Sequence, residues 1–337
     1  MKSLRIVIAG GTGHLGTILA THFHSVGHSI TILSRTEHSS SGEIVPWDGE
    51  TLGDWVSQLE GADVLINLAG RSVNCRYTPA NRTSIMNSRV RSTRVLGEAI
   101  GRLGRPPRLW INSSTATIYR HSLDRPMDED TGEFGGHEPG VPESWRFSIE
   151  VARSWEDAFF SAETPRTRKI ALRSAVVMSP PQGGAFDILL RLVRFGLGGA
   201  VASGDQYISW IHEVDFARAV EYLASNETIE GPINIASPNP LPNRDFMREL
   251  RRAYGVKLGT PAPKWLLEIG TRLLQTESEL VLKSRRVVPG RLLRSGFQFA
   301  FPDWPTAAGD LVSRWRNSSY SESPSRPTSY LPYPLPL

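Results

Sequence analysis

Hydrophobic and polar positions alternate along the first half of the chain in a pattern that predicts strands separated by helices. Short runs rich in β-branched residues predict buried strands at 4–9, 29–34, 43–47, 63–68, 108–113 and 169–178. Apolar residues at helical spacing predict helices at 15–26, about 81–103 and 146–160. This repetition predicts an α/β fold of the Rossmann type, a doubly wound parallel sheet with helices on both faces.

The pattern changes after residue 178. Glycines become frequent, strands become shorter, and helical spacing dominates after Asn243. We expect residues 1–178, completed by strands from 206–236, to form the main sheet domain, and residues 179–316 to form a smaller, mostly helical C-terminal lobe. Segment 317–337 is rich in Ser, Pro and Tyr, which predicts a disordered tail.

A glycine-rich turn follows the first predicted strand and opens the first helix, with the sequence Gly10-Gly11-Thr12-Gly13-His14-Leu15-Gly16. In a dinucleotide-binding turn the first glycine permits the tight bend, the second lets backbone approach a pyrophosphate, and the third allows close helix–sheet packing. The helix that begins near His14 adds unpaired N–H groups and a positive dipole end. We therefore predict a cofactor site that contains Gly10, Thr12, Gly13, His14, Leu15 and Gly16.

The end of the second predicted strand indicates which dinucleotide binds. Enzymes that use NAD place Asp or Glu there to bind the ribose 2′-hydroxyl, whereas this chain has Ser34-Arg35-Thr36. A guanidinium beside a hydroxyl suits a 2′-phosphate, so we predict NADP(H) as the cofactor. The turn Asn67-Leu68-Ala69-Gly70 ends the fourth strand, and its small residues would let backbone lie along the ribose and nicotinamide.

A candidate catalytic hydroxyl lies at the end of the fifth predicted strand. The sequence Ser113-Ser114-Thr115-Ala116-Thr117-Ile118-Tyr119 resembles the strand end that carries this hydroxyl in short-chain dehydrogenase/reductases. Thr115 occupies that position and is a candidate to hydrogen-bond a substrate carbonyl. Tyr119 is the phenol nearest to Thr115 in sequence, so it is a candidate acid–base; the alternative is that it packs inside its loop.

The Tyr and Lys that short-chain dehydrogenase/reductases use, one helical turn apart, have no counterpart here. No Tyr or Lys stands between Arg120 and Arg168. Alignment from Glu156 places the two positions at Ser148 and Ala152, and alignment from Phe147 places them at Phe147 and Val151. Neither register supplies an acid–base.

More narrowly, the chain resembles the atypical "epimerase family" within the extended short-chain dehydrogenase/reductases, NADP-dependent oxidoreductases also described as nucleoside-diphosphate-sugar epimerases. The resemblance runs from about residue 4 to 315, and its C-terminal part matches that family's domain of unknown function. Further segments that carry it are Ser88-Arg89, Leu172-Arg173-Ser174, Phe195–Gly199, Ser209–His212, Arg286–Pro289 and Gly296–Phe299. The resemblance implies NADP contacts by Ser34, Arg35, Leu68, Ala69, Arg89 and Val177. Arg71 departs from the family, which commonly has Glu there.

Two functions follow as alternatives. One is an NADP(H)-dependent oxidoreductase or epimerase that acts on a carbonyl or sugar-like substrate, with the helical lobe on the substrate side and Thr115 polarising the oxygen. The other is a non-catalytic protein that binds NADP(H) as a sensor or interaction module. The missing Tyr–Lys pair favours the second, and the retained glycine turn and hydroxyl favour the first.

Composition excludes several other classes. The formal net charge is +4 and the pI about 9.3, but the basic clusters 248–252 and 283–294 are typical of solvated helix faces, so we expect no nucleic-acid partner. The single cysteine, Cys75, excludes an intrachain disulfide, and we expect no metal site. No leader-like segment and no apolar run near ~18 residues occur, so we expect a soluble, cytoplasmic protein without membrane partners. His212 is expected to be structural.

Overall fold

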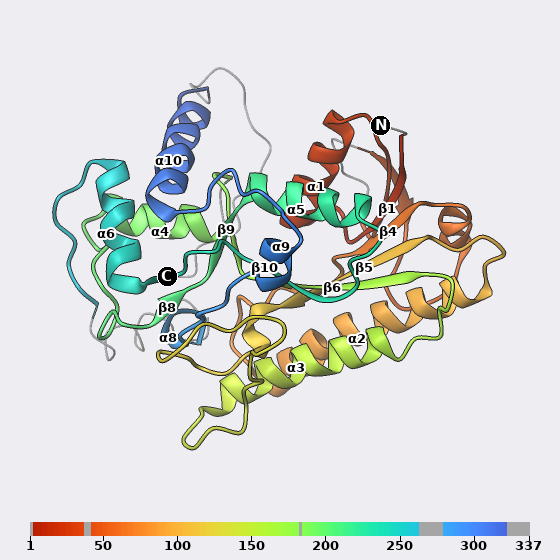
Figure 1. Ribbon diagram of the computed structural model, residues 1–337, viewed down its shortest axis with the longest axis horizontal. Coiled ribbons are helices and arrows are strands. Elements are labelled where there is room, and N and C mark those ends of the chain that lie inside the picture. Colours follow the sequence, from red (N-terminus) through yellow and green to blue (C-terminus); the bar gives the residue numbers. More distant parts are fainter. Residues whose placement is uncertain (1–2, 37–41, 182–183, 263–278, 322–337) are drawn as a thin grey trace.

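A seven-stranded parallel sheet is the centre of the computed structural model, which describes residues 3–36, 42–181, 184–262 and 279–321 (Figure 1). The strand order is β10-β6-β5-β4-β1-β2-β3. The strands are β1 (Arg5–Ala9), β2 (Ser29–Ser34), β3 (Glu43–Pro46), β4 (Val64–Asn67), β5 (Leu109–Thr115), β6 (Arg168–Ser174) and β10 (Gly231–Ile235). Every neighbouring pair is parallel, which confirms the predicted Rossmann-type fold.

Helices cover both faces of this sheet, as strands buried on both sides require. On one face α1 (His14–Ser25) and α5 (Glu213–Ser225) pack together over a core of Ile, Leu and Phe side chains. On the other face α2 (Pro79–Arg102) and α3 (Glu143–Phe160) run side by side (Figure 1). Two short 3₁₀ turns, η1 (Asp54–Leu59) and η2 (Ala116–Ile118), follow β3 and β5.

The strand register brings the carboxyl ends of the central strands to a common edge. Ala9 at the end of β1 pairs with Asn67 at the end of β4, and Asn67 pairs with Asn112 of β5. The chain reverses its direction of travel across the sheet between β3 and β4, on either side of β1. In open α/β sheets ligands bind outside the carboxyl ends at such a switch point.

The predicted strand at 169–178 is wrong in one respect, because the chain changes partners at its middle. After β6, Ala175 donates its N–H to the Ile235 carbonyl, and Val176 then donates to Ser209. The following β7 (Val176–Met178) thus leaves the main sheet and pairs with β9 (Trp210–His212). A second small pair joins β8 (Tyr207–Ile208) to β11 (Leu241–Pro242).

Five further helices of the described residues follow β7 outside the main sheet and its covering helices. They are α4 (Ala185–Arg194), α6 (Asn243–Tyr254), α8 (Glu279–Leu282), α9 (Gly290–Arg294) and α10 (Trp304–Ser321). Three of these helices, α4, α6 and α10, enclose an aromatic core in which the Phe246 and Trp304 rings stack 3.9 Å apart. The expected tail begins too early, because α10 continues through 317–321; the rest of it, 322–337, lies outside the described residues. No helix within the described ranges has the length and apolar character needed to cross a bilayer.

Candidate functional site

The glycine turn after β1 packs so closely that the protein's own backbone requires two of its glycines. Gly10 has φ +75°, and a Cβ there would lie 2.9 Å from the Ala69 backbone. A Cβ at Gly16 would lie 2.4 Å from the Gly11 carbonyl oxygen. At Gly13 a Cβ would meet, among the described residues, only the Gly10 oxygen at an ordinary 3.5 Å. The fold itself therefore makes no demand for glycine at position 13.

The start of α1 offers backbone N–H groups rather than side chains. Within the described part of the chain no side chain caps this helix, whose cap residue is Gly13. The first N–H groups of a helix lack intrahelical partners and carry partial positive charge, which suits an anion. The His14 ring is engaged elsewhere, 2.6 Å from the Ser179 hydroxyl, and burial lowers its pKa. Leu15 packs against the core beneath the sheet.

Hydroxyl groups gather at the end of β2, where the sequence analysis expects the 2′-phosphate to bind. The buried Ser34 hydroxyl lies 3.0 Å from the Thr12 hydroxyl and 3.1 Å from the Thr36 hydroxyl. Ser34 also accepts the Thr36 backbone N–H at 3.1 Å. Arg35 is exposed beside this cluster. The structure thus brings Thr12, Ser34 and Arg35 to one corner of the carboxyl edge.

Buried amides hold the turn after β4 in place. Asn67 donates to the Asn112 side chain at 2.7 Å, and its own side-chain oxygen accepts the Ala69 backbone N–H at 3.0 Å. Leu68 and Ala69 are half-buried and Gly70 is exposed, so the turn presents its backbone along the carboxyl edge. This is where the prediction placed Leu68, Ala69 and Gly70.

Arg89 supports that turn from beneath. Its guanidinium donates to the Arg71 carbonyl at 3.0 Å and lies 5.1 Å from the Trp155 ring centroid. A Cβ at Gly70 would come within 3.2 Å of the Arg89 guanidinium carbon. Burial lowers the pKa of Arg89 to about 10, so it is a cation at neutral pH. Arg71, the departure from the family pattern, donates to the Asn81 side chain at 2.7 Å.

Val177 differs from the other predicted cofactor contacts. Its side chain is 8% exposed and belongs to the core cluster on the α1–α5 face. The neighbouring Val176 is 36% exposed. Because side chains alternate along a strand, β7 turns Val177 inward, and the Val177 side chain is not on the carboxyl-edge surface.

Thr115 ends β5 with its hydroxyl oriented by the following turn. Its side-chain oxygen accepts the Thr117 backbone N–H at 3.1 Å. This bond uses the oxygen as an acceptor and leaves the O–H as a donor. Thr115 is half-buried, so it keeps the position at the carboxyl edge that a substrate-polarising hydroxyl needs.

Tyr119 does not reach that edge, which corrects its candidacy as the acid–base. Its side chain is 1% exposed; the phenol accepts a bond from Arg173 at 2.9 Å and donates to Asn234 at 2.9 Å. Arg173 is itself held by both carboxylate oxygens of Glu156, at 2.7 and 2.8 Å. Burial raises the pKa of Tyr119, although the Arg173 charge opposes this shift. The phenol is thus part of a structural network that joins β5, β6, β10 and α3.

His212 is held in structural contacts, as the sequence analysis expects. His212 is fully buried, caps α5 through the Val214 N–H at 3.1 Å and contacts Asp310 at 3.0 Å. Burial lowers the pKa of His212. The described residues contain no group of three or more His, Cys, Asp or Glu side chains placed to hold a metal.

A buried lysine next to the Thr115 turn was missed by the sequence analysis, which interpreted 283–294 as a solvated face. The Lys283 side chain is 0% exposed, and its ammonium donates to the Thr117 carbonyl at 2.8 Å. Lys283 also lies 3.9 Å from the Glu279 carboxylate. Burial, together with the Arg285 charge, lowers the pKa of Lys283 to about 7 although Glu279 opposes the shift.

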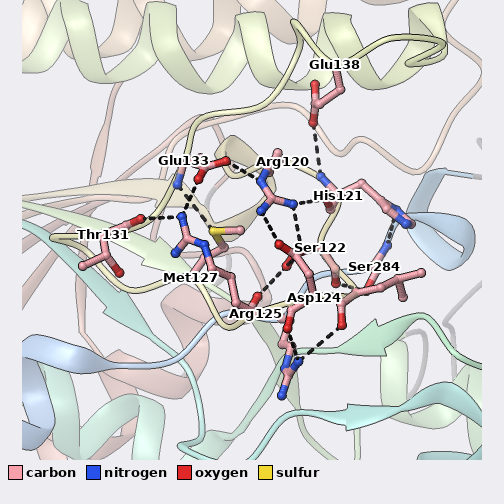
Figure 2. Close-up of polar contacts among 12 residues, drawn as sticks. Arg120, His121, Ser122, Asp124, Arg125, Met127, Thr131, Glu133, Glu138 and Ser284 are labelled. Carbon is pink, nitrogen blue, oxygen red and sulfur yellow. Dashed lines mark hydrogen bonds and ion pairs between the residues drawn. The ribbon is translucent and has the colours of Figure 1, made fainter.

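The loop after η2 fastens this lysine in place. Figure 2 shows Arg120 at the loop's centre, donating to Asp124 at 2.8 Å and to Glu133 at 2.6 Å. Ser284, next to Lys283, donates its N–H to the His121 ring at 3.1 Å and its hydroxyl to the Ser122 carbonyl. The C-terminal segment thus docks on the carboxyl edge and completes the polar surroundings of Thr115.

Comparisons with known proteins agree with this architecture. The model of the NAD dependent epimerase/dehydratase family matches residues 6–236, and a domain of unknown function (DUF1731) matches residues 262–311. The epimerase family protein YfhF of Bacillus subtilis is 29% identical over 313 residues, covering 92% of this chain and 98% of that protein. The mouse epimerase family protein SDR39U1 is 30% identical over 320 residues, covering 92% and 100%. The crystal structure of human epimerase family protein SDR39U1 with NADPH has a TM-score of 0.80 and 27% identity, covering 92% and 99%.

Proposed function

Because the chain belongs to the NAD dependent epimerase/dehydratase family, we propose that it binds NADP(H) at the carboxyl edge of the sheet and acts on a carbonyl or sugar-like substrate. The observation that carries the cofactor assignment is the space at Gly13. A Cβ there would make only an ordinary contact among the described residues, so close approach of a pyrophosphate is the reason for glycine at this position. The uncapped start of α1 supplies the N–H groups for that anion.

Preference for the phosphorylated cofactor rests on the β2 corner. Thr12, Ser34 and Thr36 form a hydroxyl cluster, and Arg35 is the adjacent cation. A guanidinium binds a phosphate through paired, charge-assisted hydrogen bonds, whereas NAD offers only a hydroxyl there. The human relative SDR39U1, whose crystal structure contains NADPH, supports the same choice.

Beside the cofactor, the protein itself would contribute a hydrogen-bond donor and close-lying backbone to the reaction. Bound NADPH would supply a hydride to a carbonyl carbon. Thr115 would donate its O–H to the substrate oxygen, and the small residues of the Asn67–Gly70 turn would let the substrate and nicotinamide lie close to the backbone. These groups support carbonyl reduction or its reverse as the reaction class; the reverse is also the first half of a sugar epimerisation.

The alternative is a protein that binds NADP(H) without turnover. Two observations favour it: α3 has no Tyr–Lys pair, and Tyr119 is locked in a buried network. Under this alternative Thr115 is a structural cap of η2. Cofactor binding is common to both functions, so the binding test and the turnover test are separate.

Calorimetry with NADPH and NADH tests the cofactor assignment. Arg35→Glu should weaken NADPH binding about 100-fold, since it removes a charge-assisted phosphate contact worth about 1.5–3 kcal/mol and adds repulsion, while NADH affinity changes little. Arg252→Glu on α6 makes the same charge change elsewhere and should leave both affinities unchanged. Equal losses for the two cofactors in Arg35→Glu would refute the 2′-phosphate site.

NADPH oxidation against a panel of carbonyl compounds and nucleotide sugars tests catalysis. Turnover that Thr115→Ala abolishes, with NADPH affinity retained, supports the enzyme. Tight NADPH binding without turnover of any member of the panel would favour the sensor alternative.

A further inference from the structure

A phenol from outside α3 occupies the place where α3 itself offers only a serine. Tyr77 lies in the loop between the Asn67–Gly70 turn and α2, and its hydroxyl is 3.3 Å from the Ser148 hydroxyl. Ser148 is the position at which one alignment register requires the family's acid–base Tyr. The Tyr77 ring packs edge-on against Phe147, with centroids 5.0 Å apart, which fixes its approach to α3. Tyr77 is half-buried.

Two guanidinium groups interact electrostatically with this phenol. Burial lowers the pKa of Arg89, and the negative charge of an ionised Tyr77 opposes that shift. Burial likewise lowers the pKa of Arg285, again opposed by Glu279 and then by Tyr77. Arg89 holds the turn after β4, whereas Arg285 donates to the Thr117 hydroxyl at 3.2 Å. Tyr77 therefore interacts with one cation that contacts the cofactor turn and with another that contacts the Thr115 turn.

A chain of polar groups connects the phenol to the buried lysine. The Ser148 hydroxyl contacts Tyr77 and donates to a carboxylate oxygen of Glu279. The other Glu279 oxygen is 3.9 Å from the Lys283 ammonium and 3.6 Å from Arg285. Because burial brings the pKa of Lys283 to about 7, this ammonium gains and loses a proton near neutral pH. The chain thus ends on a group that can exchange protons under working conditions.

We propose that Tyr77 is the proton-transfer residue of this site, and that Ser148 and Glu279 connect it to Lys283. This inference rests on the proposed NADP(H)-dependent function. In the reducing direction the Tyr77 phenol gives its proton to the substrate oxygen while NADPH supplies the hydride to the carbonyl carbon. In one concerted relay, Lys283 gives a proton to the Glu279 carboxylate, Glu279 gives one to Ser148, and Ser148 gives its own to the Tyr77 phenolate. The net change is a neutral Lys283 and an alcohol, and the reverse direction restores the ammonium.

The Tyr–Lys pair that α3 lacks is then rebuilt from two other parts of the chain. The phenol comes from the loop before α2, and the lysine comes from the segment that contains α8. Among the described residues, the charged or titratable groups around Tyr77 and its connection include Cys75, Arg82, Arg89, Arg285, Glu279, Lys283, His121 and Glu138.

Tyrosinate absorbance gives a readout that needs no substrate. The difference spectrum between the wild type and Tyr77→Phe isolates the ionisation of Tyr77 during a pH titration, and Tyr77→Phe keeps the ring contact with Phe147. The positive charge of an oxidised nicotinamide at this site favours the phenolate. Saturating NADP⁺ should therefore shift the Tyr77 ionisation to lower pH by about 1 unit or more. The matched control is the difference spectrum between the wild type and Tyr222→Phe, which removes a phenol bonded to the Ser295 carbonyl. It isolates the ionisation of Tyr222, which should not respond to NADP⁺.

A second variant tests the connection to the lysine. Lys283→Met removes the group that supplies the proton at the end of the chain. It should slow carbonyl reduction by NADPH and remove the fall in rate that the wild type shows as the pH rises through about 7, where Lys283 loses its proton. Calorimetry on the same proteins reports NADP⁺ binding independently. If NADP⁺ binds and the Tyr77 ionisation does not respond to it, the inference is wrong and the proposed function stands. If NADP⁺ does not bind the wild type, both the proposed function and this inference are wrong.

Discussion

Lys283→Met should change how the stability of this protein depends on pH. The wild-type ammonium is fully buried, donates to the Thr117 carbonyl at 2.8 Å and has Glu279 at 3.9 Å. The nearby charge of Arg285 lowers the pKa of Lys283, whereas the charges of Glu279 and Glu138 raise it. Burial is the largest influence and brings the pKa from 10.5 to about 7. Met has a similar length and no charge, so the variant removes the titration with little change in packing.

The sign and size follow from proton linkage. Between pH 7 and 10.5 the unfolded chain holds a proton on Lys283 that the folded protein has released, so the free energy of unfolding rises with pH. Below about 7 both states are protonated, and the full cost of burying the ammonium is present. From pH 7 to pH 10.5 this titration raises the free energy of unfolding by about 5 kcal/mol, at 1.36 kcal/mol per pKa unit. Between pH 7 and pH 9 the rise is about 2 kcal/mol.

Urea unfolding of both proteins at pH 7 and pH 9 measures this directly. Between the two pH values the free energy of unfolding of the wild type should rise by about 2 kcal/mol more than that of Lys283→Met, because the variant lacks the titrating group. Lys257→Met, at an exposed lysine, is the control and should follow the wild type. Parallel pH dependence in the wild type and Lys283→Met would show that the ammonium is solvated, which would refute the buried placement.

The other predictions concern the glycine turn and the buried ion pair. Gly13→Ala should leave the melting temperature nearly unchanged, because the added Cβ has room in the protein. It should weaken NADPH binding at least about tenfold, because the Cβ occupies the space that the ligand needs. Gly16→Ala should instead lower the melting temperature, because its Cβ would lie 2.4 Å from the Gly11 oxygen. Thermal melts and calorimetry on the pair separate the two effects, and equal destabilisation would contradict the assignment. Glu156→Gln should cost about 3–5 kcal/mol in urea unfolding, because it leaves the Arg173 guanidinium, 5% exposed, without its anion; a loss below about 1 kcal/mol would mean that water reaches the pair.

Local patterns predicted the sheet domain well because its signals lie within short segments. Each central strand is a compact β-branched run buried on both faces, and the glycine turn joins β1 directly to α1. The β2 corner was also predictable, since Thr12 and Ser34 follow adjacent parallel strands whose carboxyl ends must meet. Because the strands are parallel neighbours, the residues at their carboxyl ends lie close together and form one site.

Predictions failed where long-range partners decide the outcome. A single apolar run became β6 and β7 because Val176 bonds to Ser209 rather than to the main sheet. Tyr119 follows Thr115 closely in sequence, but Arg173 and Asn234, from β6 and β10, draw its phenol into the interior. Neither partner can be identified from the local sequence around Tyr119.

Lys283 is the strongest case of this kind. Its neighbours in sequence are other basic residues, a pattern typical of a solvated face, yet 166 positions separate it from the Thr117 carbonyl that it contacts. What buries it is the docking of Ser284 on His121 and Ser122, which belong to the loop after η2. The C-terminal segment therefore does more than cover the sheet domain. It brings a cation to the turn that orients Thr115, so a change in that segment should alter the chemistry of the site even where the glycine turn and the β2 corner are intact.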